Sequence, residues 1–197
     1  GKERFLRNGD GDVCSDYFEQ SSYEYFQKRL HSLSEEDLKV QDMMIRLSVG
    51  CNLPQTEESR YVEVKYPTEW KERLIVIARH IAGLRIETED RLIYPKLNLS
   101  GKTLRLEAAD MNLYDGIPGL AVFFASVISV YRIREFDELY EDLTAVMFRY
   151  TRECLEDKKE EVFKGTGMFV GEGSVVYGYL LLYQISGRKE HLKYAKK

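Results

Sequence analysis

The sequence has few cysteines, and their scatter argues against two kinds of site. Cys14, Cys51 and Cys154 are the only cysteines among 197 residues, and no two of them form a C-x-x-C pair. Such pairs mark zinc and redox sites, so the cysteine pattern predicts neither. An odd number of widely spaced cysteines is typical of reduced thiols in a cytosolic protein rather than of a disulfide framework.

Long hydrophobic runs and an excess of one charge are also missing. The longest apolar stretch, Leu120 to Val130, contains two serines and is well short of the ~20 residues that span a bilayer. It predicts a buried helix, and we expect no integral membrane segment. The 29 basic and 33 acidic residues give a net charge of -4, which provides no basic field for nucleic acid. No nucleic-acid partner is therefore expected.

The hydrophobic content of the sequence predicts a globular protein, since 44% of the residues are hydrophobic. The N-terminal sequence GKERFLRNGDGD is polar, whereas a signal peptide needs an apolar stretch. We expect a cytoplasmic protein, and association with a membrane surface stays open.

The first part of the sequence predicts a loop and two helices. Turn-forming residues fill 1–22, and a helix is expected over 23–33. Its apolar face would comprise Tyr23, Phe26, Leu30 and Leu33. Ser34 and Asp37 form a capping box that starts a second helix, and Gly50 is expected to end it.

A third helix and a hairpin follow. The amphipathic pattern over 68–83 predicts a helix that stops at Gly83. Its apolar face comprises Trp70, Leu74, Ile77, Ala78 and Ile81. The apolar pattern then changes around the Ser100-Gly101 turn, which predicts a two-stranded hairpin whose first strand Pro95 confines to a sheet edge.

Four more helices are expected after the hairpin, and glycines separate them. They cover 117–132, 137–156, 174–186 and the residues from 188 onward. The last has no stop signal, so we expect that the sequence was cut inside or just after a helix.

An internal repeat links two of these helices. DGIPGLAVFFASVISVY from Asp115 aligns without a gap with VGEGSVVYGYLLLYQIS from Val170, an offset of 55 residues that places Gly116 on Gly171. Both segments are glycine turns that open an apolar helix, as expected for inner helices. The intervening helix is amphipathic and charged, as expected for an outer layer. Alternating inner and outer helices predict a mainly α fold, an incomplete α/α toroid with a small β-hairpin, or an open solenoid.

The two glycine segments resemble a known family. NLYDGIPGLAVFFA from Asn112 is similar to the first glycine-helix repeat of the LanC-like cyclase fold, and GMFVGEGSVVYGYLLLYQISGRKEHL from Gly167 resembles the second. Ser174 stands where the family usually has another glycine. Tyr25 to Val49 resembles the junction of class II (LanM-type) lanthipeptide synthetases, where a dehydratase domain precedes the cyclase. The resemblance implies a dehydratase-to-cyclase junction over 1–67 and the first part of a cyclase domain over 68–197.

The resemblance also implies an activity and cofactors. Such bacterial enzymes of lantibiotic (bacteriocin) biosynthesis dehydrate serine and threonine in a precursor peptide and then add cysteine thiolates to form lanthionine rings. ATP and magnesium would serve the dehydratase domain, and zinc would serve the cyclase. The expected partners are the precursor peptide and the dehydratase domain of the same polypeptide. We expect the zinc ligands outside this chain, no cofactor bound to it, and no activity of the isolated chain.

No residue is assigned as catalytic, cofactor-binding or metal-binding. Neither the cysteines nor His31, His80 and His191 match the zinc motifs of the family. His80 lies beside the apolar face of its helix and is expected to be packed or partly solvated, while His31 and His191 lie among charges and are expected to be exposed. Cys154 is expected to be a plain buried thiol.

The N-terminal loop has the spacing of a calcium loop but lacks its glycine. Asn8, Asp10, Asp12, Asp16 and Glu19 occupy the ligand positions one, three, five, nine and twelve. Val13 stands at the position that requires glycine, so calcium binding is not expected.

Two other function classes stay open. A non-catalytic helical-repeat module could bind a peptide, and an α/α-toroid carbohydrate enzyme could use paired carboxylates near the inner-helix starts, for which Asp115 and Glu172 are the candidates. The favoured interpretation of Asp115 is an N-terminal cap that interacts with the helix dipole.

Overall fold

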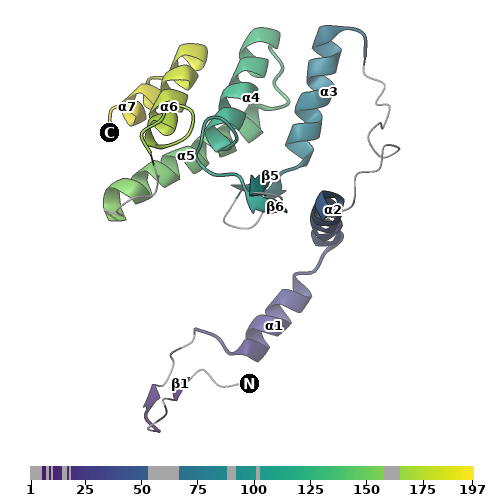
Figure 1. Ribbon diagram of the computed structural model, residues 1–197, viewed down its shortest axis with the longest axis vertical. Coiled ribbons are helices and arrows are strands. Elements are labelled where there is room, and N and C mark those ends of the chain that lie inside the picture. The colour runs from purple at the N-terminus through teal and green to yellow at the C-terminus, as the bar shows by residue number, and fades with distance from the viewer. Residues whose placement is uncertain are drawn as a thin grey trace. The chain divides into compact units, whose positions relative to one another are not determined.

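The computed structural model describes residues 6–7, 9, 11–14, 17, 19–52, 67–87, 92–100, 103–157 and 165–197 (Figure 1). The chain divides into two compact units, Gly1–Gly50 and Cys51–Lys197, which we describe separately. The functional boundary between 67 and 68 rests on sequence resemblance and stays a prediction.

The first unit contains a short hairpin and two helices. Strands β1 (Leu6–Arg7) and β2 (Val13–Cys14) pair antiparallel, and the helices are α1 (Ser22–His31) and α2 (Glu35–Asn52). Both predicted helices are therefore confirmed.

Side chains cap the starts of these helices. The Ser21 hydroxyl accepts the Glu24 amide at 3.2 Å, and the Glu24 carboxylate accepts the Ser21 amide at 2.8 Å. The predicted cap at Ser34 is confirmed, because its hydroxyl accepts the Asp37 amide at 3.1 Å. The Asp37 carboxylate pairs with Arg29 at 3.0 Å.

One prediction for this unit is wrong. Gly50 lies inside α2, which continues to Asn52, so glycine does not end the helix there. The apolar face predicted for the first helix is exposed, and α1 buries no residue. The exposed residues are Tyr23, Phe26, Leu30 and Leu33.

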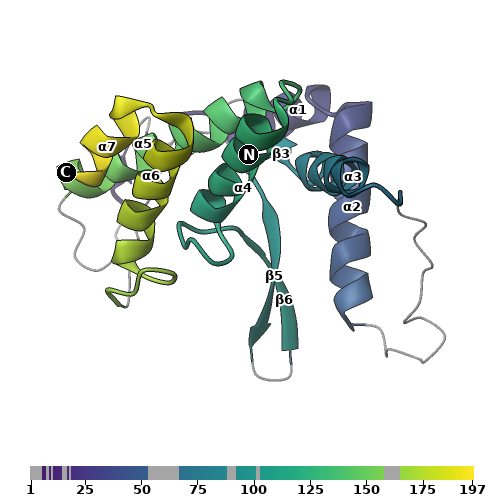
Figure 2. The same cartoon turned by 90° about the horizontal axis from the view of Figure 1, so that it is seen from above.

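The second unit is mainly helical, with a small antiparallel hairpin, which confirms the predicted fold class (Figure 2). Its helices are α3 (Trp70–Gly83), α4 (Ile117–Tyr131), α5 (Asp137–Asp157), α6 (Glu172–Ser186) and α7 (Lys189–Ala195). Its strands are β3 (Ile86–Glu87), β4 (Leu92–Ile93), β5 (Pro95–Ser100) and β6 (Thr103–Ala108). Helix α4 packs against α5 and α6, and α6 packs against α7.

The predicted hairpin is confirmed as the antiparallel pair β5 and β6. Leu97 lies opposite Leu106, and Pro95 begins the first strand opposite Ala108. Because β5 and β6 form a two-stranded sheet, Pro95 lies on an edge strand, where a missing amide donor is tolerated. The predicted turn residue Gly101 lies outside the described residues.

The core lies between α4, α5 and α6. Its largest fully buried apolar side chains are Phe124, Leu143, Met147, Tyr179 and Leu182. The outer helix α5 buries Leu139, Leu143 and Met147 at intervals of four residues, which is the stripe expected of an amphipathic helix. The inner helices are not covered all round, since Val130 on α4 and Val176 and Leu180 on α6 are exposed.

Helix α3 joins this core with only part of its predicted face. Ala78 is buried, and Leu74 and Ile81 pack against the core cluster. Trp70 is 77% exposed, and the Arg73 guanidinium lies 5.2 Å from its ring centre. Trp70 begins the helix one turn before the buried stripe, so the predicted apolar face is only partly buried.

Candidate functional site

The internal repeat is a repeat of structure, and its two glycine loops form the candidate site. The amide of Ile117 donates to the carbonyl of Asp110 at 2.8 Å, and the amide of Glu172 donates to the carbonyl of Gly165 at 2.9 Å. Donors and acceptors are each 55 positions apart. The two loops therefore close in the same way before their helices begin.

The helices after the loops also end at equivalent positions. Residues 117–131 form α4 and 172–186 form α6, 15 residues each. Each is followed by a left-handed residue, Arg132 with φ 54° and Gly187 with φ 70°. The predicted repeat thus extends over whole helices.

Close backbone approach explains the paired glycines. A Cβ on Gly116 would lie 2.3 Å from the Asp110 carbonyl oxygen, and one on Gly171 would lie 2.3 Å from that of Gly165. Gly171 also has φ 122°, where side chains other than glycine are strained. Both positions therefore require glycine.

Ser174 replaces the second glycine of the motif and links the loops. Its hydroxyl donates to the carbonyl oxygens of Met111, at 3.1 Å, and Gly171. In the first repeat, a Cβ on the equivalent Gly119 would lie 2.3 Å from the Leu113 carbonyl oxygen. The serine is fully buried, so the departure from the family pattern gives the second loop an additional contact with the first.

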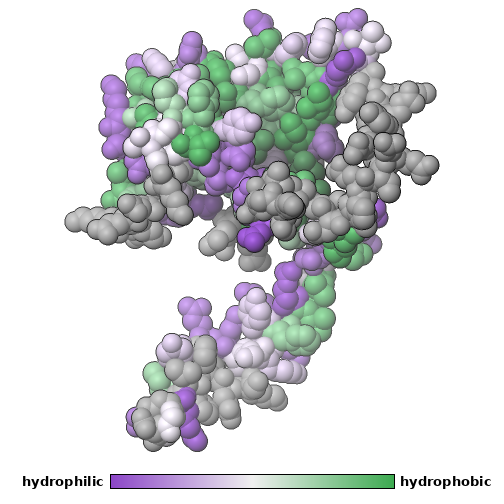
Figure 3. All heavy atoms as spheres, viewed as in Figure 1, coloured by the Kyte–Doolittle hydropathy of each residue, from purple (hydrophilic) through white to green (hydrophobic). Residues whose placement is uncertain are grey.

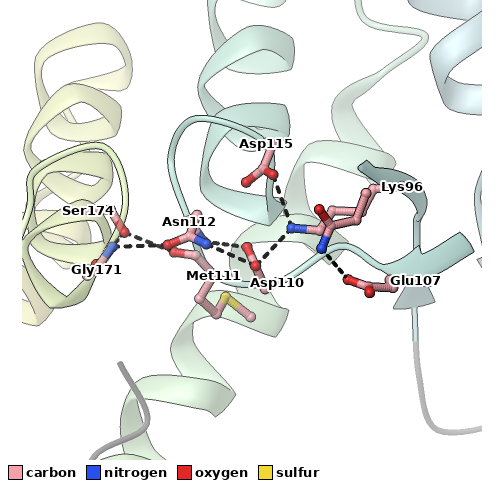
Figure 4. Close-up of polar contacts among 9 residues, drawn as sticks. Lys96, Glu107, Asp110, Met111, Asn112, Asp115, Gly171 and Ser174 are labelled. Atoms are coloured by element: carbon pink, nitrogen blue, oxygen red, sulfur yellow. Dashed lines mark hydrogen bonds and ion pairs between the residues drawn. The ribbon is translucent and has the colours of Figure 1, made fainter. Parts of the chain in front are cut away.

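Asn112 connects the two loops most directly (Figure 4). Its side-chain oxygen accepts the Gly171 amide at 3.0 Å, while its own amide and side-chain nitrogen both donate to Asp110 at 2.9 Å. A second link joins the Tyr114 amide to the Phe169 carbonyl at 3.1 Å. The loops lie side by side at the same ends of α4 and α6 (Figures 1 and 2).

Lys96 holds the first loop from the hairpin side. Its ammonium group lies 2.8 Å from the Asp110 carboxylate and 3.1 Å from that of Asp115. The lysine comes from β5, so a polar chain runs from the hairpin through Asp110 and Asn112 to the second loop (Figure 4).

These contacts favour the charged forms of their groups. Partial burial disfavours the charge of Lys96, but its hydrogen bonds to Asp110 and Asp115 outweigh burial and raise the pKa of Lys96 above its usual value. Burial likewise opposes the charge of Asp110, yet the bonds from Lys96 and Asn112 hold the pKa of Asp110 below its usual value. Both groups are charged at neutral pH.

The prediction that Asp115 caps α4 is wrong. Gly116 is the N-cap residue, and no side chain makes a cap hydrogen bond there. Asp115 precedes the cap and pairs with Lys96 instead. Glu172, the other half of the candidate carboxylate pair, is the first residue of α6 and is exposed.

The three histidines differ in their surroundings. His31 is exposed, with Nδ1 2.7 Å from the Gln27 carbonyl, and His80 is exposed as well. The prediction that His191 is exposed is wrong, since it is 1% exposed. Its ring stacks on Phe148, and its Nε2 lies 2.9 Å from the Tyr140 hydroxyl. Burial lowers the pKa of His191, because the neutral ring is favoured there.

No metal centre is formed by the described part of the chain. Within it, no three His, Cys, Asp or Glu side chains converge as potential metal ligands, whereas a catalytic zinc needs three protein ligands. Cys154 is half-buried near Tyr150 and Cys14 is exposed, while the side chain of Cys51 lies outside the described residues. The described residues do not fit a zinc site.

The segment with the spacing of a calcium loop includes part of the hairpin formed by β1 and β2. Val13 lies in β2 opposite Arg7, and a strand stands where the helix that enters a calcium loop would end. Three of the five residues with this spacing, Asn8, Asp10 and Asp16, lie outside the described residues.

Comparison with known proteins finds a family match over the part of the chain that holds the paired loops. Residues 107–197 match the family described as lanthionine synthetase C-like protein. The match covers both glycine loops and α4 to α7, and it supports a LanC-like domain of lanthionine-cyclase type in this part of the chain. Class II membership and the junction over Tyr25 to Val49 belong to the proposal below.

A second likeness is more distant. The chain is 25% identical over 178 residues to a protein named DNA polymerase from Autographa californica nuclear polyhedrosis virus. The alignment covers 81% of this chain and 17% of that protein, so the chain spans less than a fifth of the relative's length.

No described helix is both long enough and apolar enough to cross a membrane.

Sequence reasoning identified the glycines but missed the polar residues around them. The pattern Asp110-x-Asn112 before a glycine is typical of a turn in which side chains bind the backbone, and it was the available signal. Nothing in the sequence around Lys96 indicates its contact, because the lysine reaches the loop only through the fold of the hairpin.

Proposed function

We propose that this chain is part of a bifunctional, class II lanthipeptide synthetase. The parent enzyme would dehydrate serine and threonine of a precursor peptide and close lanthionine rings by zinc-assisted addition of cysteine. The observation that carries the proposal is the family match over 107–197, which spans two loops of equivalent geometry. The segment 1–67 would be the junction with the dehydratase domain.

In this proposal the described residues form a scaffold for a neighbouring active site. Gly116 and Gly171 let each loop pass close to its own backbone, and Asn112 fixes one loop against the other. The paired contacts set the spacing between the starts of α4 and α6. A scaffold of this kind positions a neighbouring site without itself touching the reacting atoms.

Zinc would act in the complete cyclase by lowering the pKa of the substrate thiol. The described residues do not fit a zinc site, and we propose that the ligands come from residues outside this chain. ATP and magnesium would belong to the dehydratase domain, and this chain would bind none of these groups. We assign no catalytic step to its residues.

Two observations bear on the alternatives. A peptide-binding module without chemistry is favoured by exposed apolar side chains on the loops, Tyr114, Met168, Phe169 and Val170. For a carbohydrate enzyme, Asp115 would need a free carboxylate, and its pairing with Lys96 argues against that role. The chain is similar to a protein named DNA polymerase, but its net charge of -4 gives no support to nucleic-acid binding.

The test uses the isolated chain and the parent protein. Metal analysis of the 197-residue chain should find no stoichiometric zinc, and the parent protein should convert a dehydrated peptide with free cysteines into a thioether-bridged product, followed by loss of thiol. A parent protein that binds this peptide without consuming its thiols would contradict the cyclase and support the binding module. Stoichiometric zinc in the isolated chain would overturn the assignment of its ligands elsewhere.

A further inference from the structure

We infer that the two glycine loops together form a docking surface for a peptide segment in which lysine or arginine alternates with bulky apolar residues. This paired-loop surface comprises Tyr114, Asp115, Met168, Phe169, Val170 and Glu172. The inference rests on the proposed function, because it names the kind of peptide that the LanC-like domain would hold.

The surface is apolar at its centre. Tyr114 is 79% exposed and Phe169 is 61% exposed, and Met168 and Val170 beside Phe169 are exposed as well. Single exposed apolar residues are common, but contiguous ones mark interaction sites. The backbone bond between the Tyr114 amide and the Phe169 carbonyl, at 3.1 Å, brings the two loops together at these residues. Figure 3 shows hydrophobic atoms next to hydrophilic ones on the face of the second unit that is in view.

Contacts among the loop residues support the surface in the absence of a peptide. The Phe169 ring meets Tyr177 edge to face, with centroids 6.1 Å apart and an interplanar angle of 84°. A bridge between Thr166 and Gly171 closes the second loop, and Asn112 anchors it to the first. A preformed surface binds more tightly than a mobile one, because less conformational entropy is lost.

The sequence segments that hold the two loops are acidic. The segments 106–131 and 165–187, which hold the loops and both inner helices, contain no lysine or arginine. They contain four carboxylates, Glu107, Asp110, Asp115 and Glu172. Lys96 is the described cation that pairs with Asp110 and Asp115. Glu172 is exposed and takes part in none of the ion pairs between described residues, so its negative charge remains for a cationic partner.

Exposed rings and carboxylates together select a cation. A lysine or arginine side chain can lie over an exposed aromatic ring within about 6 Å while its charge faces a nearby carboxylate. Glu172 lies three residues after Phe169 and is the carboxylate offered to the cation, whereas Asp115 beside Tyr114 already pairs with Lys96. A bulky apolar side chain next to the cation would then cover Met168 and Val170 and remove their surface from water.

Direct binding tests the surface separately from catalysis. Two fluorescently labelled peptides of equal length, one alternating lysine with leucine and the other glutamate with leucine, are titrated with the full 197-residue chain, and anisotropy is measured. Neither peptide contains serine, threonine or cysteine, so no lanthionine chemistry can contribute. We expect at least tenfold tighter binding of the lysine peptide, and weaker binding as the salt concentration rises.

Matched variants locate the binding. Phe169→Ala and Glu172→Gln should each weaken binding of the lysine peptide at least threefold, and the double variant about tenfold. Val130→Ala and Glu138→Gln change an exposed apolar and an exposed acidic residue away from the loops, and they should leave binding unchanged. Circular dichroism and the melting temperature verify that the exposed positions tolerate the changes.

The outcomes separate this inference from the proposed function. Equal affinity for the two peptides, or unchanged affinity in the double variant, overturns the docking surface even if the parent protein closes rings. Selective binding that the double variant loses supports the surface even if the parent protein proves to be no cyclase.

Discussion

The side-chain oxygen of Asn112 accepts a hydrogen bond from the backbone amide of Gly171, 59 residues later in the chain, at 3.0 Å. The bond joins two loops whose own closing hydrogen bonds are equivalent. Asn112 is in turn held by Asp110, and Asp110 by Lys96. The relative position of the two inner helices thus depends on a short chain of polar contacts as well as on apolar packing.

Replacing Asn112 by alanine should lower the free energy of unfolding by about 1–3 kcal/mol, because the Gly171 amide loses its acceptor. Asn98→Ala is the control, since Asn98 also binds a carboxylate, that of Glu107 at 2.9 Å, but on the exposed hairpin. Its effect should stay within about 0.5 kcal/mol. Urea unfolding followed by circular dichroism measures both, and equal effects would contradict the role given to Asn112.

Gly171→Ala should be strongly destabilising. Its φ of 122° disfavours a side chain, and the new Cβ would lie 2.3 Å from the Gly165 carbonyl oxygen. Backbone strain of this kind costs about 1–3 kcal/mol before the clash is counted. Gly83→Ala is the matched control, because no atom lies within 4 Å of that Cβ, and it should be neutral or stabilising by up to about 1 kcal/mol. A melting temperature of G171A at or above that of G83A would show that the loop can relax.

Stability should fall as the pH drops through the range in which histidine titrates. Burial, and the charge of Arg188 next to it, lower the pKa of His191 in the folded chain. Below the unfolded value of about 6.5 the unfolded chain therefore binds the proton first. The stabilisation is complete above that pH and is lost as the pH falls through the lower folded pKa.

The group that faces His191 from α5 is Tyr140, and Tyr179 approaches from α6. Three charged residues lie near His191. They are Arg188 at the N-cap of α7, Glu190 in α7 and Glu141 in α5. Unfolding measured between pH 7.5 and 5 should show a smaller decline for His191→Gln than for the unchanged chain. An identical decline in both would place the titrating group elsewhere.

Tyr94 provides a test of a buried hydroxyl. The residue is 3% exposed, its hydroxyl has no hydrogen-bond partner among the described residues, and burial raises the pKa of Tyr94 to about 12. Tyr94→Phe removes the buried polar atom and should be neutral or stabilising by up to about 2 kcal/mol. Tyr94→Ala removes the ring and should cost about 3–5 kcal/mol. A destabilising Tyr94→Phe would reveal a hidden partner for the hydroxyl.

The periodic spacing of apolar residues predicted the helices and the hairpin, whose limits depend on local sequence. The helices at 117–131, 137–157 and 172–186 lie within two residues of their expected limits, because apolar spacing and glycine stops act within one element. The hairpin followed from its change of period for the same reason. The repeat was visible because its two copies place the same small residues against the same backbone atoms.

What could not be predicted depends on distant partners. His191 has charged neighbours in sequence, yet α7 packs it between Phe148 and Tyr140. Asp115 has the right place and chemistry for a cap, but Lys96 from the hairpin engages it. The spacing of apolar residues predicted the face of α1 but not its partner, and the helix buries nothing within its own unit.

The polar chain from Lys96 to Gly171 also has a direction. Lys96 meets Asp110 and Asp115 later in the sequence, Asp110 orients Asn112, and Asn112 receives Gly171 later still. Synthesis proceeds from the N-terminus. The hydrogen-bonding or ion-pairing partner of each new segment has therefore been synthesised before the segment itself. The second loop can form its contacts with the first loop without breaking any contact formed earlier. The repeats can therefore fold one after another, in the order in which they are synthesised.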